Sequence, residues 1–460
     1  MNEIRILYFL FLVISLIVTF YDIIFVSHEG YNNLFILPLI FTFIMVIRNL
    51  FTPKGIVINI IDVIYFMKFV VLSFMVVYSG WYEGRAVFPP QINSFNKAII
   101  FMTLEFLCIN ILYFLILSKI DVNIKKNNLG LRTIDVKKDI VYKSYIFISL
   151  IFLVFTYHSI SFLGINNSEH IIESNQLTIF FNICLYISKY LIIGYIIRFY
   201  FIKYTYNPKK IYITFTVIFV LIICSIFIGD NRMDAVLPLL SIFILLNYLY
   251  KKRMIVYNAI FPLFMVLAVY LISLRRETFT YQITENKSAL ITDYLQIYMT
   301  GVYNTAISLE LRNDYSNSFI GFFYDLIRPF LGLNFLWRSE NIKTSTELFN
   351  FKIFGTENQV SQIIPLIGQF NLPFGIFGIP IYVFIITLFI YSFLRILKGI
   401  YIIEAMIVLP LIVRLCITYF QNISIFINEL SSIVIIFCVL KLVIIFIKKD
   451  SISKERNSFK

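Results

Sequence analysis

The chain has 460 residues, of which 60% are hydrophobic and only 14% are charged, whereas soluble domains carry about 25% charged residues. This balance excludes a soluble globular protein and indicates an integral membrane protein. The net charge of +13 would suggest nucleic acid in a soluble chain. Here the basic residues cluster in alternate short loops, which is typical of membrane topology, so we expect no nucleic-acid partner.

Apolar stretches of about 20 residues, the length that crosses a bilayer, recur along the whole chain. The first follows Arg5. We expect it to be retained, because its apolar core is too long for a signal peptide and no small-residue cleavage site follows. The pattern predicts an all-α, polytopic integral membrane protein that forms a single membrane-embedded domain over residues 1–460. It has about twelve transmembrane helices, at residues 6–27, 31–47, 56–79, 96–118, 145–164, 177–201, 211–228, 235–250, 254–274, 374–394, 399–420 and 429–447.

The loops alternate between those rich in lysine and arginine and those that contain neither residue. Lysine and arginine gather in residues 119–143, 198–210 and 251–253 and in the tail after Phe446, and are missing from residues 28–33, 165–176 and 421–428. Because cytoplasmic loops carry the excess of positive charge, the basic loops face the cytoplasm. Both termini are therefore expected to be cytoplasmic.

One connection is much longer than the others. Residues 275–360 join the ninth and tenth expected helices and lie outside by the same charge rule. They are rich in tyrosine and phenylalanine, so we expect an ordered extracytoplasmic loop that is partly packed on the bundle. Residues 288–311 show an imperfect helical stripe. Residues 318–337 are interrupted by Asp325, Arg328 and Pro329, and predict an interfacial or re-entrant helix.

The hairpin at residues 227–240, FIGDNRMDAVLPLL, places Arg232 between Asp230 and Asp234 on the outer side. Outer loops disfavour positive charge, yet the long loop holds further arginines, at Arg275, Arg276, Arg312, Arg328 and Arg338. A guanidinium fork suits phosphate and pyrophosphate oxygens. The other interpretation is that Arg232 pairs with a neighbouring aspartate to stabilise a tight turn. Residue types alone leave both interpretations open.

Two motifs carry a resemblance to a known family. GDNRMDAVL (229–237) precedes a span, and TENQVSQIIPLIGQFNLPFGIFGIPI (356–381) leads from the long loop into the next one with a Phe-Gly-x-x-Gly pattern at Phe374, Gly375 and Gly378. Together with the topology, these motifs resemble the O-antigen polymerases, the oligosaccharide repeat-unit polymerases of bacterial surface polysaccharide pathways. The motifs are short, because this family diverges widely in sequence.

The resemblance implies a polyprenyl-pyrophosphate-dependent glycosyltransferase in the bacterial plasma membrane. It would join undecaprenyl-pyrophosphate-linked repeat units into O-antigen or capsule at the outer face. The implied partners are the lipid-linked donor and acceptor glycans and the bilayer, with a separate chain-length regulator and flippase in the pathway. The reaction requires no nucleotide or metal, and the five cysteines lack the paired spacing of a metal site. We therefore expect no metal or cofactor.

The reaction also suggests site residues. The leaving pyrophosphate needs cationic stabilisation, and the candidates are Arg232, Arg275, Arg276, Arg328 and Arg338. The acceptor hydroxyl would benefit from a carboxylate base, and the candidates are Glu357 and Asp325, with Glu340 behind them. For each of these acids the alternative is an ordinary salt-bridging or solvated carboxylate.

Two other functions stay open. O-antigen ligases share the topology but typically use a histidine in the large loop, whereas the histidines here, His28, His158 and His170, lie elsewhere. A lipid-linked oligosaccharide flippase would also have about twelve helices and buried charges, but its outer loops should be short. The long loop favours an enzyme that assembles a site at the membrane surface.

Six ionisable residues fall within the expected spans: Asp62, Lys68, Glu105, Lys189, Glu404 and Arg414. Each costs at least about 2.5 kcal/mol at the bilayer centre unless it is paired or hydrated. Asp62 and Lys68 point about 120° apart on one helix, so their partners must lie on other helices or in a watery cavity. These residues line either a polar crevice for the sugar-pyrophosphate head or a set of interhelical pairs that fix packing.

Overall fold

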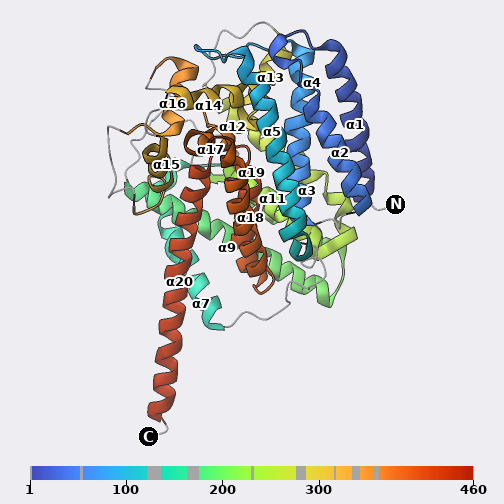
Figure 1. The fold of residues 1–460 in the computed structure, drawn as a ribbon. Coiled ribbons are helices and arrows are strands. Elements are labelled where there is room, and N and C mark those ends of the chain that lie inside the picture. The colour runs from blue at the N-terminus through green and yellow to red at the C-terminus, as the bar shows by residue number, and fades with distance from the viewer. Residues whose placement is uncertain are drawn as a thin grey trace. The chain divides into compact units, whose positions relative to one another are not determined.

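The computed structural model describes residues 3–51, 55–121, 136–162, 176–228, 233–275, 286–314, 318–333, 342–356 and 362–458. Helix dominates these ranges, in which the only strands are β1 (Ile160–Phe162) and β2 (Ile226–Ile228) (Figure 1). The prediction of an all-α, multi-pass membrane protein is confirmed. Within the described ranges eight helical segments are long and apolar enough to cross a bilayer: Ile6–Phe25, Glu29–Leu50, Ile56–Ser79, Ile92–Asp121, Lys138–Ser159, Leu177–Tyr206, Leu366–Leu397 and Ile423–Phe446.

The chain forms two compact units, each built from three separate segments. Unit 1 comprises Met1–Asn123, Tyr281–Ser392 and Arg414–Asn428, and unit 2 comprises Ile124–Thr280, Phe393–Val413 and Glu429–Lys460. Three of the five boundaries between the units fall inside helices, in α18 (Gly378–Leu397), α19 (Ile402–Thr418) and α20 (Ile423–Ser458). The single membrane-embedded domain stays a prediction.

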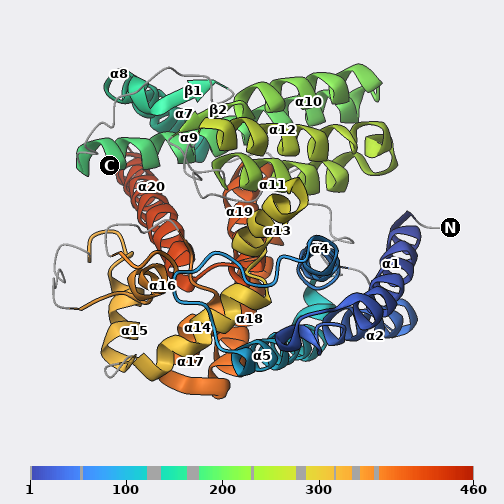
Figure 2. The same cartoon turned by 90° about the horizontal axis from the view of Figure 1, so that it is seen from above.

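The first part of unit 1 is a group of antiparallel apolar helices. It contains α1 (Glu3–Phe25), α2 (Ile36–Phe51), α3 (Ile56–Tyr65), α4 (Leu72–Ser79) and α5 (Ile92–Leu112). Helices α1 and α2 lie side by side (Figure 2). A π-helical segment, Phe66–Val71, joins α3 to α4 within one continuous span. The rings of Phe41 and Tyr65 both stack on Phe106, which joins three of the spans in one aromatic core.

The long loop supplies four further helices to unit 1: α13 (Lys287–Met299), α14 (Val302–Asp314), α15 (Ser318–Ile327) and α16 (Ser345–Phe354). The next helix, α17 (Leu366–Phe374), begins the span Leu366–Leu397. Helix α13 packs on α4, and α14 packs on both α5 and α17 (Figure 2). The stripe at residues 288–311 is therefore two helices, because Thr300 takes a left-handed conformation with φ of 45° before Gly301. Helix α15 ends before Pro329, which has no backbone N–H to continue it.

Unit 2 contains α7 (Val136–Ile151), α8 (Leu153–Thr156), α9 (Gln176–Tyr206), α10 (Lys210–Cys224), α11 (Met233–Tyr250) and α12 (Ile260–Arg275). Helix α9 packs against α7 and α10. Tyr142, Leu191, Ile403 and Ile436 belong to its buried hydrophobic core, which also draws on α19 and α20.

Several expected helix boundaries are wrong. The expected helices 145–164 and 211–228 stop at Ser159 and Cys224, and the chain then continues as β1 and β2. These strands pair antiparallel, with Ile160 opposite Ile228. Their sequences, ISF and IFI, are mostly β-branched and aromatic, and pairing satisfies backbone groups that lipid cannot. The expected loop 421–428 is helical from Ile423, because the Asn422 side chain accepts a hydrogen bond from the Ile425 amide and caps α20.

Candidate functional site

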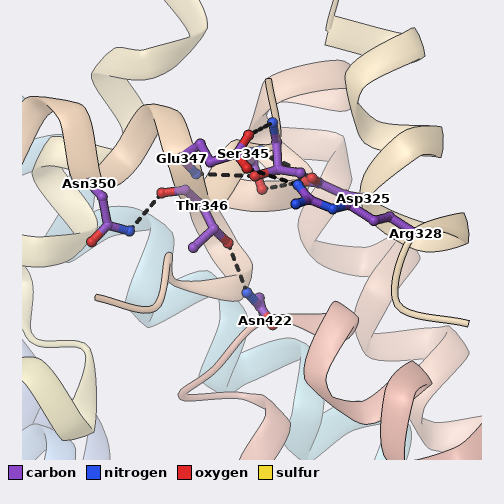
Figure 3. Close-up of polar contacts among 8 residues, drawn as sticks. Asp325, Arg328, Ser345, Thr346, Glu347, Asn350 and Asn422 are labelled. Atoms are coloured by element: carbon purple, nitrogen blue, oxygen red, sulfur yellow. Dashed lines mark hydrogen bonds and ion pairs between the residues drawn. The ribbon is translucent and has the colours of Figure 1, made fainter. Parts of the chain in front are cut away.

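The structure describes only part of the predicted site. Asp325 and Arg328 are described in full, and Arg275 is the last residue of α12, with its side chain outside the described part. The other predicted residues lie outside the described residues: Arg232, Arg276, Arg338, Glu340 and Glu357. Their roles stay predictions. Asp325 and Arg328 lie within one polar cluster of unit 1 (Figure 3).

Asp325 is a buried carboxylate on α15, only 4% exposed. The Ser345 amide donates to its Oδ1 over 3.1 Å, and the Ser345 hydroxyl donates to its Oδ2. Ser345 is the first residue of α16, so the carboxylate lies at a helix N-terminus, which favours negative charge. Figure 3 shows Asp325 pointing at this helix end.

Gln369 on α17 extends this cluster. Its Nε2 donates to Asp325 Oδ2 over 3.2 Å and to Ser424 Oγ over 3.1 Å, and its Oε1 accepts from the Ile423 amide. The Ser424 hydroxyl donates to the Asp325 carbonyl. Asn422 Nδ2 donates to Thr346 Oγ1 over 3.2 Å (Figure 3). One network of buried donors and acceptors thus joins α15, α16, α17 and the first turn of α20.

Burial raises the pKa of Asp325 to about 6, although the hydrogen bonds from Ser345 and Gln369 oppose the rise. The donors are neutral, so they compensate the buried charge less than a cation would. A general base needs a lone pair that faces its substrate, and the oxygens of this carboxylate already accept three protein donors. These contacts favour a positioning role for Asp325.

Arg328 follows α15 and pairs with Glu347 on α16. Its Nη1 lies 2.8 Å from Glu347 Oε1, and the two side chains are 48% and 31% exposed. The hydrogen bond to Glu347 raises the pKa of Arg328. Glu347 also completes a capping box with Thr344 at the start of α16. The pair with Glu347 therefore engages Nη1 of a half-exposed guanidinium.

Arg85 was missed by the sequence reasoning, although it lies at the centre of the polar contacts around α13. It sits in the connection between α4 and α5. Its Nη1 lies 2.9 Å from Asp293 Oδ2, and its Nη2 donates to Gln362 Oε1 over 2.9 Å. Burial raises the pKa of Asp293, and the guanidinium opposes the rise. A sequence signal was present, because the predicted topology places this connection on the outer side and it holds an arginine beside a glycine.

The Phe-Gly-x-x-Gly motif forms the tight turn between α17 and α18. Gly375 has a φ of 61°, a left-handed conformation, and a Cβ there would overlap Nη1 of Arg312. A Cβ at Gly378 would lie 2.6 Å from the Phe370 carbonyl oxygen. The two glycines therefore allow a close helix junction and let the Arg312 guanidinium rest on it. Arg312 is exposed, and no acid pairs with it among the residues that the structure describes.

The ionisable residues within the spans of unit 1 pair between helices. Arg48 Nη2 lies 3.2 Å from Asp62 Oδ1, and the Tyr8 hydroxyl donates to Asp62 Oδ2 over 2.6 Å. Lys68 Nζ, in the π-helical segment, lies 3.1 Å from Glu105 Oε2. The prediction that Asp62 and Lys68 find partners on other helices is confirmed.

The remaining members of that set also have partners. In unit 2 the Lys189 ammonium donates to the Ile226 carbonyl on β2 over 2.7 Å, and Lys138 Nζ lies 3.0 Å from Glu404 Oε1. In unit 1 Arg414 Nη1 donates to Gln421 Oε1 over 3.1 Å. These contacts favour the packing interpretation over a polar crevice for the six residues.

The comparisons with known proteins add no relative. No protein-family model, curated protein or solved structure matches the chain. Among the described residues, no group of three or more His, Cys, Asp or Glu side chains could hold a metal ion. The resemblance to polymerases therefore rests on the sequence motifs and stays a prediction.

Proposed function

We propose that this protein is a polymerase that joins undecaprenyl-pyrophosphate-linked oligosaccharide units at the outer face of a bacterial plasma membrane. Four apolar helices, α10, α11, α12 and α19, would bring the eight long spans to the expected twelve. With both termini in the cytoplasm, α13 to α16 would lie on the outer side. The O-antigen or capsular product follows from the sequence resemblance alone.

One observation carries the proposal: an exposed cation lies beside an apolar surface in the long loop. Arg312 rests on the Gly375 turn, and Phe319 and Phe377 on either side of that turn are exposed. The ring of Phe319 lies 5.6 Å from that of Phe374, the residue before Gly375. A lipid-linked pyrophosphate presents a polyanion on a hydrocarbon chain. A guanidinium at the edge of an aromatic surface matches both parts of that molecule.

In the proposed reaction, a hydroxyl oxygen of the acceptor unit attacks the anomeric carbon of the growing chain. The bond from that carbon to the pyrophosphate oxygen breaks, and the lipid pyrophosphate leaves with the electron pair. Arg312 and Arg328 stabilise its charge, together with the candidates Arg232, Arg275, Arg276 and Arg338. The hydroxyl proton passes to a carboxylate. Glu357 is the stronger candidate for this base, because Asp325 is engaged by three donors.

The test uses a strain that lacks the gene and carries variant copies of it instead. Surface polysaccharide and lipid-linked intermediates from each strain are separated on a gel. Arg312→Gln should lose the polymer ladder and keep single-unit product and membrane abundance, whereas Arg312→Lys should retain part of the ladder. The matched control is Arg253→Gln, an exposed arginine whose Nη1 donates to the Pro208 carbonyl in unit 2, and it should leave the ladder intact. A normal ladder from Arg312→Gln would contradict the role of Arg312.

A transport function is the second candidate, and a specific feature of unit 2 favours it. Two apolar segments leave the helical conformation at Ile160 and Ile226 and pair as β1 and β2, with Lys189 bonded to one strand. Discontinuous spans of this kind occur at the substrate sites of transporters. The same gel separates the functions, because a flippase defect traps intermediates inside. A ligase defect exposes intermediates outside without final transfer.

A further inference from the structure

Helix α15 has an apolar face that no described residue covers. Phe319, Ile320 and Phe323 are each more than half exposed, whereas Phe322 and Tyr324 are buried. These positions form one stripe, since residues three and four apart share a helix face. The buried side packs on α17, where the ring of Phe322 lies 5.5 Å from that of Phe374.

The exposed face of α15 lies beside an exposed stripe that begins at Phe377. Phe377 is 74% exposed, and Ile381, Phe384 and Leu388 follow it at helical spacing along α18 with exposed side chains. Helix α18 belongs to the span Leu366–Leu397, whose outward side chains meet lipid. Because α15 contacts Phe374, three residues before Phe377, its face lies where this lipid-facing stripe begins.

Two exposed arginines lie near this face. Arg328 directly follows α15 and pairs with Glu347, and Arg312 rests on Gly375, next to Phe374. Aromatic side chains flanked by arginine and lysine are typical of helices that lie in a membrane interface. With ten residues at 1.5 Å per residue, α15 is about 15 Å long. It is too short to enter the hydrocarbon core and return, and the half-exposed Arg328 follows it directly.

We propose that the α15 face, together with Phe377, lies in the lipid bilayer at the boundary between headgroups and acyl chains. Phe319, Ile320, Phe323 and Phe377 insert among the upper acyl chains, and the Arg312 and Arg328 guanidinium groups lie at the level of the lipid phosphates. The helix therefore lies in the interface rather than re-entering the membrane. This surface also carries the proposed pyrophosphate ligands Arg312 and Arg328, but the assignment concerns contact with bulk lipid, and its test measures that contact rather than polymer.

Tryptophan fluorescence of the full-length protein in phosphatidylcholine vesicles tests the assignment. Phe323→Trp and Phe377→Trp are made separately, and the signal of the unchanged protein, with Trp81 and Trp337, is subtracted. Vesicles contain either ordinary lipid or lipid brominated near the top of the acyl chain, and iodide serves as the aqueous quencher. The control is Phe351→Trp on α16, an exposed ring near the Lys343 ammonium.

Phe323→Trp and Phe377→Trp should both give blue-shifted emission that brominated lipid quenches and iodide does not quench. The Phe351→Trp control should show the reverse. Red-shifted emission from both variants, quenched by iodide and insensitive to bromine, would place the face in water and overturn the proposal. Equal bromine quenching of the control would also overturn it, because the lipid contact would then not belong to this face.

Discussion

Two buried carboxylates in unit 1 are compensated in different ways. Glu105, inside the span Ile92–Asp121, meets the Lys68 ammonium at 3.1 Å. Asp325, in the loop helices, meets the amide and hydroxyl of Ser345 and the amide of Gln369. At hydrocarbon depth a charge needs an opposite charge or water. Nearer the surface, a helix N-terminus and neutral donors suffice, but the charge remains costly and the pKa of Asp325 rises.

The largest expected effect comes from separating the pair within the span. Lys68→Met should destabilise the protein by about 3–5 kcal/mol, because Glu105 would keep a buried charge without its partner. The double variant Lys68→Met with Glu105→Leu should lose much less. Thermal unfolding in detergent, followed by size-exclusion chromatography, measures both. If the loss of stability in the double variant equals the sum of the losses in the two single variants, the two residues do not stabilise each other.

The second effect is a pH dependence from Asp325. Its pKa is about 6 in the folded protein, against an ordinary value of 3.8. Between these values the folded chain holds a proton that the unfolded chain has lost, so stability should rise as pH falls from 7 to 4. The difference corresponds to roughly 3 kcal/mol at most. Comparing the unfolding of the unchanged protein and Asp325→Asn across this range isolates the contribution, and identical curves would contradict it.

The third effect separates positioning from catalysis at Asp325. Asp325→Ala should cost about 1–3 kcal/mol, because the Ser345 amide and Gln369 lose their acceptor in a buried place. Asp325→Asn keeps an acceptor and should cost less. If the residue only positions α16, Asp325→Asn should also keep most polymer on the gel. A stable Asp325→Asn protein that makes no polymer would instead identify the carboxylate as the base.

The smallest effect on stability is expected at Arg328. Its pair with Glu347 is partly exposed, so Arg328→Ala should cost about 0–1 kcal/mol. Glu347→Gln breaks the same pair and serves as the matched control. If Arg328 binds pyrophosphate, Arg328→Ala should reduce polymer more than Glu347→Gln does at equal membrane abundance. Equal polymer from the two variants would limit Arg328 to its salt bridge.

Sequence patterns predicted which segments are helical better than they predicted the residues at which those helices begin and end. Apolar length alone located the eight long apolar helical segments, since the bilayer thickness is fixed, and the expected total of twelve spans stays a prediction. It did not reveal the strand pair at Ile160 and Ile226, because three apolar residues look alike in a helix and a strand. The break at Thr300 was also missed, since a left-handed threonine has no simple sequence signature.

The site was less predictable, because partners depend on the packing of distant segments. The angle between Asp62 and Lys68 showed that they do not pair, but it did not identify Arg48 and Glu105. Asp325 was selected for its residue type, and its three donors became known only from the fold. Arg85 could not be singled out from the sequence, because its partners Asp293 and Gln362 lie more than 200 residues further along the chain.

The contacts of Arg85 also impose an order on synthesis. Arg85 and Asp293 are 208 residues apart, and Arg85 and Gln362 are 277 apart. At the usual speed of a ribosome, the first interval takes roughly 10–40 s. During that time the early helices are in the membrane, and Arg85 cannot pair with Asp293 because that residue has not yet been synthesised. A chain that stops short of α13 would lack both Asp293 and Gln362, so the contacts that hold the α4–α5 connection against the later helices would never form.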